Sequence, residues 1–197
     1  MGCGNGLFLE RLSAWGEVTG IEIDASLVTD DAPLRHRIHH QPLGDPLYRS
    51  MGFGLITALD VIEHIADDAA AVHEMATLLV PGGYLMVTVP AFASLWDEHD
   101  DLNQHFRRYR AAQLRRLLEP HVRILKLRYL FPSLFPVKLA VAALNRFRRR
   151  KVVQAQIPSP ATTVVMDGWL RLEDRVTGGL RLPLGTSVLA LAQKALG

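Results

Sequence analysis

The sequence predicts an α/β domain in which a mostly parallel sheet lies between two layers of helices. Strand-like and helix-like segments alternate over residues 1–130 of the 197-residue chain. This order favours parallel strands that are joined by crossover helices. The chain also begins with a glycine-rich turn that leads directly into an amphipathic segment. An apolar fraction of 49% over this length is sufficient for one domain with a sizeable core.

The first expected elements are a helix and three strands. Apolar residues recur at helical spacing over 7–15, where Gly16 ends the segment. The β-branched run 17–23 predicts a short strand, and residues 37–41 predict a weaker one. Residues 53–59 form a continuous apolar run, which is typical of a strand that helices cover on both faces.

The later elements follow from capping residues and apolar periodicity. Asp67 and Asp68 can cap a helix whose apolar positions continue to Leu79, and Pro81-Gly82-Gly83 ends it before a buried strand at 84–89. Beyond these we expect, in order, a helix at 114–118, a strand at 122–127, helices at 137–147 and 165–176, and a strand at 186–192. We interpret residues 1–197 as a single domain with a core at 1–130, a helical lid or insertion at 131–180 and a last strand at 181–197.

Composition excludes several classes of protein. The single cysteine, Cys3, excludes a disulfide scaffold and fits a reducing, cytoplasmic compartment. The longest apolar stretch, 131–147, contains two prolines and Lys138, so it is a poor membrane span. Charge is divided unevenly, with 4 Lys/Arg against 15 Asp/Glu in residues 1–100 and 18 against 5 in residues 101–197. The basic residues accompany no nucleic-acid reading module, so we expect no nucleic-acid partner.

The glycine run Gly2-Cys3-Gly4-Asn5-Gly6 lies where the first helix begins. Without side chains the backbone can approach a ligand, and the start of the helix offers free N–H donors. A dinucleotide fingerprint requires Gly-x-Gly-x-x-Gly, but residue 7 is leucine, which disfavours a nicotinamide-dependent oxidoreductase. Tight turns also collect glycines, so the loop alone leaves a ligand role open.

Two acidic residues follow the next expected strands. Glu22 ends the strand at 17–23, where a carboxylate can accept hydrogen bonds from both hydroxyls of a ribose. Asp45 is placed to accept a hydrogen bond from an adenine amino group. The alternatives are a solvated loop acid for Glu22 and a turn former in Gly44-Asp45-Pro46 for Asp45.

Four separate motifs follow one another at defined spacings within about residues 1–130. The motifs are Gly2-Cys3-Gly4-Asn5-Gly6, Gly20-Ile21-Glu22-Ile23-Asp24, Leu59-Asp60-Val61-Ile62-Glu63-His64 and Leu79-Val80-Pro81-Gly82-Gly83-Tyr84-Leu85. Their order and spacing resemble those of the class I S-adenosylmethionine-dependent methyltransferases and are most similar to the small-molecule methyltransferases of the ubiquinone-biosynthesis type. The resemblance implies a Rossmann-like three-layer fold and S-adenosyl-L-methionine as the cofactor.

The resemblance also implies cofactor contacts for matching positions. The glycine loop would contact the methionine portion, and Glu22 would contact the ribose. Ile23 would lie against the adenine face and Asp45 against its amino edge. The sulfonium end would be lined by Leu59 and Asp60. The glycine-loop residues concerned are Gly2, Cys3, Gly4 and Gly6.

Methyl transfer from a sulfonium is an in-line displacement, so the protein must align the acceptor, the methyl group and the sulfur. An acceptor hydroxyl must also lose a proton, and histidine suits a base near neutral pH. Candidates follow the fourth and fifth strands of the family's sheet, at the edge where ligands bind in open sheets. We expect one of the four to be the base, although each histidine could instead hold a loop in place. The candidates are His64, His99, Asp100 and His105.

A basic cluster and a histidine cluster indicate a function less clearly than the motifs above. Arg107 and Arg108, with the adjacent Tyr109, could bind an anionic group of the substrate or could begin a charged helix face. A metal at His36, His39 and His40 is not expected, because no carboxylate or cysteine lies nearby at ligand spacing. The sequence therefore predicts no metal.

The apolar stripe 137–147 ends in the basic residues 148–151. This segment could rest on an anionic membrane as a peripheral contact over 131–151, or it could pack over the active site as a lid. We favour the lid, which would suit a small acceptor that is apolar or lipid-linked and is methylated on oxygen or carbon. The oligomeric state is not predicted.

In this family the glycine loop follows the first strand, at the centre of the sheet, but here nothing precedes Met1. We therefore expect a truncated chain whose sheet lacks its first central strand, with weak cofactor binding and low stability. The alternative to an active enzyme is an inactive or truncated cofactor-binding remnant that acts as a partner protein.

Overall fold

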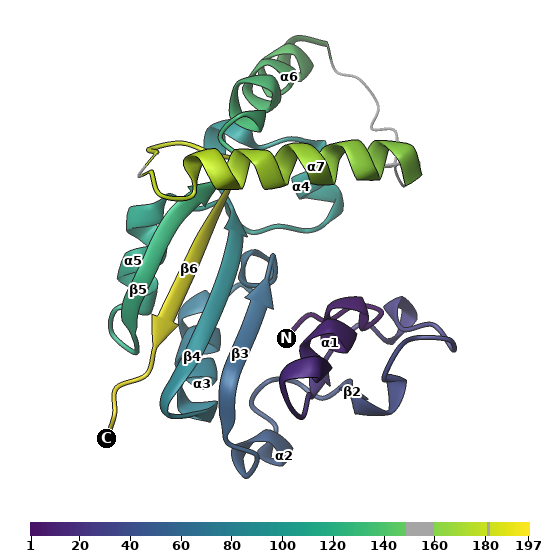
Figure 1. Ribbon diagram of the computed structural model, residues 1–197, viewed down its shortest axis with the longest axis vertical. Coiled ribbons are helices and arrows are strands. Elements are labelled where there is room, and N and C mark those ends of the chain that lie inside the picture. The colour runs from purple at the N-terminus through teal and green to yellow at the C-terminus, as the bar shows by residue number, and fades with distance from the viewer. Residues whose placement is uncertain (149–159, 181) are drawn as a thin grey trace.

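The computed structural model describes residues 1–148, 160–180 and 182–197, and its strands form two sheets (Figure 1). In the smaller sheet, β1 (Gly20–Ile21) and β2 (Ile38–His39) are parallel. The larger sheet has the order β3-β4-β6-β5. Its strands are β3 (Phe53–Leu59), β4 (Leu79–Pro90), β5 (Arg123–Leu130) and β6 (Ser187–Gln193).

The larger sheet is mixed. β3 and β4 are parallel, as the alternation of strands and helices predicts, whereas β6 is antiparallel to both of its neighbours. β6 lies directly beside β5, and Leu130 is paired with Ser187 although more than fifty residues separate them in the chain. Alternation does not predict this reversal, because the described residues between β5 and β6 form two α-helices and no strand.

Seven α-helices are described, and each of the larger ones has a clear place around the sheets (Figure 1). α3 and α5 lie on one face of the larger sheet, α7 lies across the end where β4 and β5 finish, and α6 extends beyond it. The helices are α1 (Leu7–Leu12), α2 (Pro46–Arg49), α3 (Asp68–Leu78), α4 (Glu98–Leu102), α5 (Ala111–Leu118), α6 (Leu134–Arg148) and α7 (Pro160–Thr177).

Several expected elements have different lengths. The strand expected at 17–23 has only two paired residues, and the first helix ends at Leu12 and is followed by a 3-10 turn. β4 begins at Leu79, so Pro81-Gly82-Gly83 lies within that strand instead of before it. Asp67 caps α3 as predicted, because its carboxylate accepts a hydrogen bond from the Ala70 N–H at 2.9 Å.

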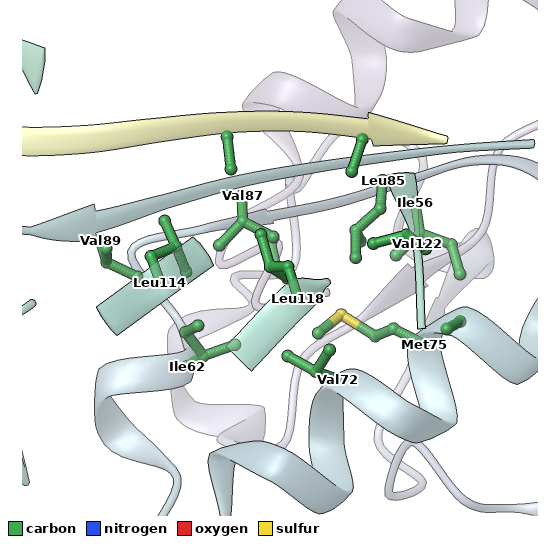
Figure 2. Packing of buried hydrophobic residues seen from close by; sticks show 14 of the residues in the cluster. Ile56, Ile62, Val72, Met75, Leu85, Val87, Val89, Leu114, Leu118 and Val122 are labelled. Atoms are coloured by element: carbon green, nitrogen blue, oxygen red, sulfur yellow. The ribbon is translucent and has the colours of Figure 1, made fainter. Parts of the chain in front are cut away.

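The hydrophobic core lies between the larger sheet and the helices α3 and α5 (Figure 2). Alternate residues of β4 point into it, which is the period of a strand with one buried face. The fully buried members include Val72, Met75, Leu85, Val87, Val89, Leu114 and Leu118. On the opposite face, Leu55 is 45% exposed and Tyr84 is 41% exposed. The expectation that residues 53–59 are covered on both faces is therefore wrong for the described residues.

The first three residues lie between the two sheets. The Met1 ammonium donates a hydrogen bond to the Thr57 carbonyl oxygen of β3 at 2.9 Å. The Cys3 N–H donates to the Ile21 carbonyl oxygen of β1 at 3.1 Å. Over the described residues no strand pairs with both β1 and β3, so these two strands belong to separate sheets.

The part of the chain beyond residue 130 is described except for residues 149–159 and 181. The basic positions 149–151 and the start of the predicted last strand therefore lie outside the described residues. Among the helices described, none combines the length and the apolar character that crossing a membrane requires.

Candidate functional site

The glycine loop adopts backbone angles that suit glycine. Gly2, Gly4 and Gly6 have φ values of +60°, +49° and +78°, all in the left-handed region. A Cβ atom at Gly6 would lie 2.6 Å from the Pro33 carbonyl oxygen, and one at Gly2 would lie 2.5 Å from Val61 Cγ2. Around Gly4, in contrast, no atom lies within 4 Å of such a position. The loop is thus packed at both ends and open at its centre.

Glu22 connects the loop to the end of β1. Its Oε2 accepts a hydrogen bond from the Gly4 N–H at 2.8 Å, and its Oε1 accepts one from the Asp24 N–H at 3.1 Å. A carboxylate has about four acceptor positions, so capacity remains for two ribose hydroxyls. The adjacent Ile23 is 61% exposed and offers an apolar surface for a base. His40 lies against the same strand end, with Nδ1 2.7 Å from the Glu22 carbonyl oxygen.

Asp45 and Cys3 have local structural contacts. The Asp45 carboxylate caps α2 by accepting a hydrogen bond from the Leu47 N–H at 2.9 Å, as expected of a turn former. Burial raises the pKa of the Cys3 thiol, which keeps it neutral. A Cβ at Gly20 would lie only 2.7 Å from Cys3 Sγ, so the glycine loop packs closely on β1.

β3 ends at Leu59, and the next residue, Asp60, lines a cavity. Asp60 has a φ of +53°, and its N–H donates a hydrogen bond to the Thr88 carbonyl oxygen at 3.0 Å. Burial raises the pKa of its carboxyl group. This turn brings Asp60 into the cavity wall. The open loop, the Glu22 carboxylate and the exposed Ile23 have the chemistry that S-adenosyl-L-methionine would require of its binding residues.

The cavity has a volume of about 420 Å³ and lies where β3 and β4 end, against the first residues of β6. The structure brings all four candidate catalytic residues to its wall, as their positions after the strands predict. Most of its lining side chains are polar. The lining residues are Asp60, Glu63, His64, Pro90, His99, Asp100, Asn103, His105, Arg108, Lys138, Thr186 and Ser187.

Asp100 is the centre of a buried hydrogen-bonded network. Its Oδ1 accepts hydrogen bonds from His105 Nδ1 at 2.7 Å and from Arg108 Nε at 2.8 Å. Its Oδ2 accepts from Arg108 Nη2 and from the Asp97 N–H, both at 2.8 Å. Burial alone would raise the pKa of Asp100, but these donors hold it below its ordinary value. Asp100 is therefore an ionised residue that positions its neighbours.

His105 is oriented by this network. An ionised carboxylate only accepts hydrogen bonds, so Nδ1 of His105 carries the proton and Nε2 is left as the basic nitrogen. The His64 ring meets the His105 ring edge to face, with centroids 4.5 Å apart. Burial, with the nearby His105, lowers the pKa of His64. His99 is exposed at the cavity mouth.

The three candidate substrate residues are in different places. Arg108 lines the cavity, but its guanidinium is occupied by Asp100 and by the Ala91 carbonyl oxygen at 3.2 Å. Arg107 and Tyr109 instead bind Asp68, at 2.8 Å and 2.7 Å, and are not in the cavity wall. Their contacts hold this loop against the start of α3.

Glu63 is a cavity residue that the sequence interpretation missed. It is fully buried, and neither carboxylate oxygen has a hydrogen-bond partner among the described residues. Burial raises its pKa to about 8. The sequence signal was its place beside His64 directly after a strand, but an acid next to a histidine in a loop is usually solvated.

The fold and this site define a class I S-adenosylmethionine-dependent methyltransferase. A family model described as a methyltransferase domain matches residues 1–121. Because that match covers more than half of the chain, the protein belongs to this methyltransferase family. The resemblance stated from the sequence motifs is confirmed.

Curated relatives and solved structures agree with this family. The ubiquinone biosynthesis O-methyltransferase of Alkalilimnicola ehrlichii is 32% identical over 96 residues, which are 44% of this chain and 38% of the relative. The enzyme of the same name from Aromatoleum aromaticum is 27% identical over 122 residues, 58% of this chain and 47% of the relative. The chain thus matches less than half the length of each.

Two solved structures share the fold. A SAM-dependent methyltransferase from Archaeoglobus fulgidus has a TM-score of 0.57 at 14% identity, covering 98% of this chain and 83% of that chain. The phosphoethanolamine N-methyltransferase 2 of Haemonchus contortus, solved in complex with S-adenosyl-L-methionine, has a TM-score of 0.55 at 14% identity. It covers 98% of this chain and 47% of that chain.

Proposed function

We propose that the chain transfers a methyl group from S-adenosyl-L-methionine to a hydroxyl oxygen, or to an activated carbon, of a small acceptor. The observation that carries this proposal is the cavity at the ends of β3 and β4, whose wall contains Asp60 together with the four candidate catalytic residues. The relatives named as O-methyltransferases favour oxygen as the methylated atom.

When bound, the cofactor supplies a methyl group that is already activated on a sulfonium. In an in-line displacement the protein's task is to hold the acceptor atom on the far side of that methyl group and to take its proton. His105 is the best-placed of the four candidates, because Asp100 fixes its ring and leaves Nε2 as the basic nitrogen. Asp100 acts as a positioning residue, through His105.

The acceptor is proposed to be apolar or lipid-linked. α6 contributes Lys138 to the cavity wall, and both α6 and α7 expose apolar side chains, such as Val141 and Trp169. We propose that residues 131–180 close over the acceptor as a lid and that the apolar surface can rest on a membrane. The inactive partner protein is the less favoured alternative, because the catalytic candidates share one cavity.

The test measures cofactor binding by calorimetry and production of S-adenosylhomocysteine with a panel of phenolic acceptors. Glu22→Ala is expected to weaken cofactor binding roughly tenfold or more, since it removes a charged hydrogen-bond acceptor worth about 1.5–3 kcal/mol. The control is Glu17→Ala, which removes an exposed acid before β1 and should leave binding unchanged. No measurable binding by the unmodified chain, or equal binding by both variants, would contradict the proposed cofactor site.

A further inference from the structure

We propose that Lys138, Thr186 and Ser187 form a subsite of the acceptor cavity that binds an anionic group of the acceptor, either a carboxylate or a phosphate. All three residues line the cavity. Lys138 belongs to α6, whereas Thr186 and Ser187 lie where β6 begins. This subsite rests on the proposed function and deepens it, because it names the chemical class of acceptor that the enzyme takes.

The lysine and arginine side chains of the cavity wall differ in how available they are to a ligand. Among the described residues that line the cavity, these side chains are Arg108 and Lys138, and both are protonated at neutral pH. All three nitrogens of the Arg108 guanidinium are occupied. Nε and Nη2 donate to Asp100 at 2.8 Å each, and Nη1 donates to the Ala91 carbonyl oxygen at 3.2 Å. An anion would have to displace Asp100 to reach this guanidinium, so Lys138 is the cation that can meet an anionic group.

The Lys138 ammonium keeps donor capacity for a ligand. Its Nζ lies 3.9 Å from Asp97 Oδ2, which is longer than a hydrogen bond, and it donates no hydrogen bond to another described residue. An ammonium group has three donors. Burial raises the pKa of the Asp60 carboxyl group, and the Lys138 charge is among the nearby charges that oppose this shift. The positive charge of Lys138 therefore acts inside the cavity, although the side chain is 41% exposed.

Thr186 and Ser187 add two hydroxyl groups to the same cavity wall. The Thr186 N–H donates to the Leu130 carbonyl oxygen at 2.9 Å, but neither hydroxyl has a hydrogen-bond partner within residues 1–148, 160–180 and 182–197. Each hydroxyl can donate one hydrogen bond to a ligand. A lysine ammonium with two hydroxyl donors suits the oxygens of a carboxylate or a phosphate, since hydrogen bonds to an ionised acceptor are the strong ones.

The anion subsite and the proposed base would hold the acceptor at two points. An acceptor with its hydroxyl at His105 Nε2 and its anionic group at Lys138 has a restricted orientation, which an in-line displacement requires. A cavity of about 420 Å³ has room for a small aromatic ring that carries both groups. The anion-binding role that the sequence suggested for Arg107 and Arg108 thus falls to Lys138.

The experiment measures, by titration calorimetry on the full chain, the binding of three phenols that differ in one substituent. The probes are para-hydroxybenzoate, para-hydroxyphenyl phosphate and the neutral para-hydroxybenzamide. At least one anionic probe should bind roughly tenfold or more tightly than the amide, because a hydrogen bond to a charged group is stronger than one to a neutral group. Lys138→Gln should abolish this preference, and Lys138→Arg should retain most of it. The matched control is Lys126→Gln, at an exposed lysine of β5 outside the cavity wall, which should leave all three affinities unchanged.

The outcomes separate this subsite from the proposed function. If neither anionic probe bound more tightly than the amide, or if Lys138→Gln kept the preference, the anion subsite would be overturned. Circular dichroism verifies that each variant is folded, and Ser187→Ala is a second test that should weaken anion binding by roughly two- to tenfold. A preference that depends on Lys138, without production of S-adenosylhomocysteine from any acceptor, would contradict the proposed function and leave the subsite standing. Equal turnover of the neutral and the anionic phenols would do the reverse.

Discussion

The larger sheet and the segment before it, residues 1–52, are stabilised in different ways. Strands of seven to twelve residues form the sheet, and their buried face packs on two helices (Figure 2). The earlier segment has strands of two residues each and relies on left-handed glycines and single hydrogen bonds such as Gly4 to Glu22. We therefore expect the larger sheet to determine global stability, whereas the positions of the glycine loop and Glu22 depend on local backbone geometry.

The largest expected effect is at the end of the sheet. Asp100→Ala should lower the free energy of unfolding by about 3–5 kcal/mol, because it leaves the buried Arg108 guanidinium without its partner. Urea denaturation measures this change. Arg115→Ala, which breaks an exposed helix pair with Glu119, is the control and should cost no more than about 0.5 kcal/mol. Similar losses for both variants would contradict the buried network.

The next effect distinguishes the two faces of the sheet. Leu85→Ala should lower the free energy of unfolding by about 2–5 kcal/mol, since it removes a fully buried side chain between β4 and the helices. Tyr84→Ala, one residue away on the open face, should cost clearly less, as that side chain is 41% exposed. Thermal unfolding of the pair is the measurement. Equal losses of stability in the Leu85→Ala and Tyr84→Ala variants would mean that the open face is also covered in solution.

The smallest effect is expected in the segment 1–52. Gly6→Ala introduces a Cβ at 2.6 Å from the Pro33 carbonyl oxygen with a φ of +78°, which should cost about 1–3 kcal/mol. Hydrogen exchange should show this loss at amides of the glycine loop and β1, with little change in β4. Gly44→Ala has open space and no left-handed φ, so it should be neutral. If Gly6→Ala instead lowered the protection from hydrogen exchange evenly over the larger sheet, local stabilisation of residues 1–52 would be contradicted.

The fold could be predicted where the residues of one element carry a clear local signal. Phe53–Leu59 and the capped helix α3 were predicted at nearly their observed bounds, because a continuous apolar run and the Asp67 cap are local signals. The direction of β6 could not be predicted, since an alternating run such as Ser187–Gln193 has the same pattern in either direction. The open face at Leu55 was also missed, because coverage depends on distant elements.

The site was partly predictable from topology. His64, His99, Asp100 and His105 were expected at one sheet edge, because strands that run parallel end on the same side, and they share one cavity. Glu63 was not expected in a buried position, because its burial results from tertiary packing that no local pattern encodes. The contacts of Arg107 and Tyr109 with Asp68 were likewise hidden, since they join segments about forty residues apart.

The pairing of Leu130 with Ser187 brings together the two ends of the segment that joins β5 to β6. Thr186 also donates its N–H to the Leu130 carbonyl oxygen at 2.9 Å, so both ends of the segment meet at one rung of the ladder. An antiparallel pair needs only a turn of about two to five residues to join it. The chain therefore leaves and re-enters the larger sheet at a single point on either side of this segment.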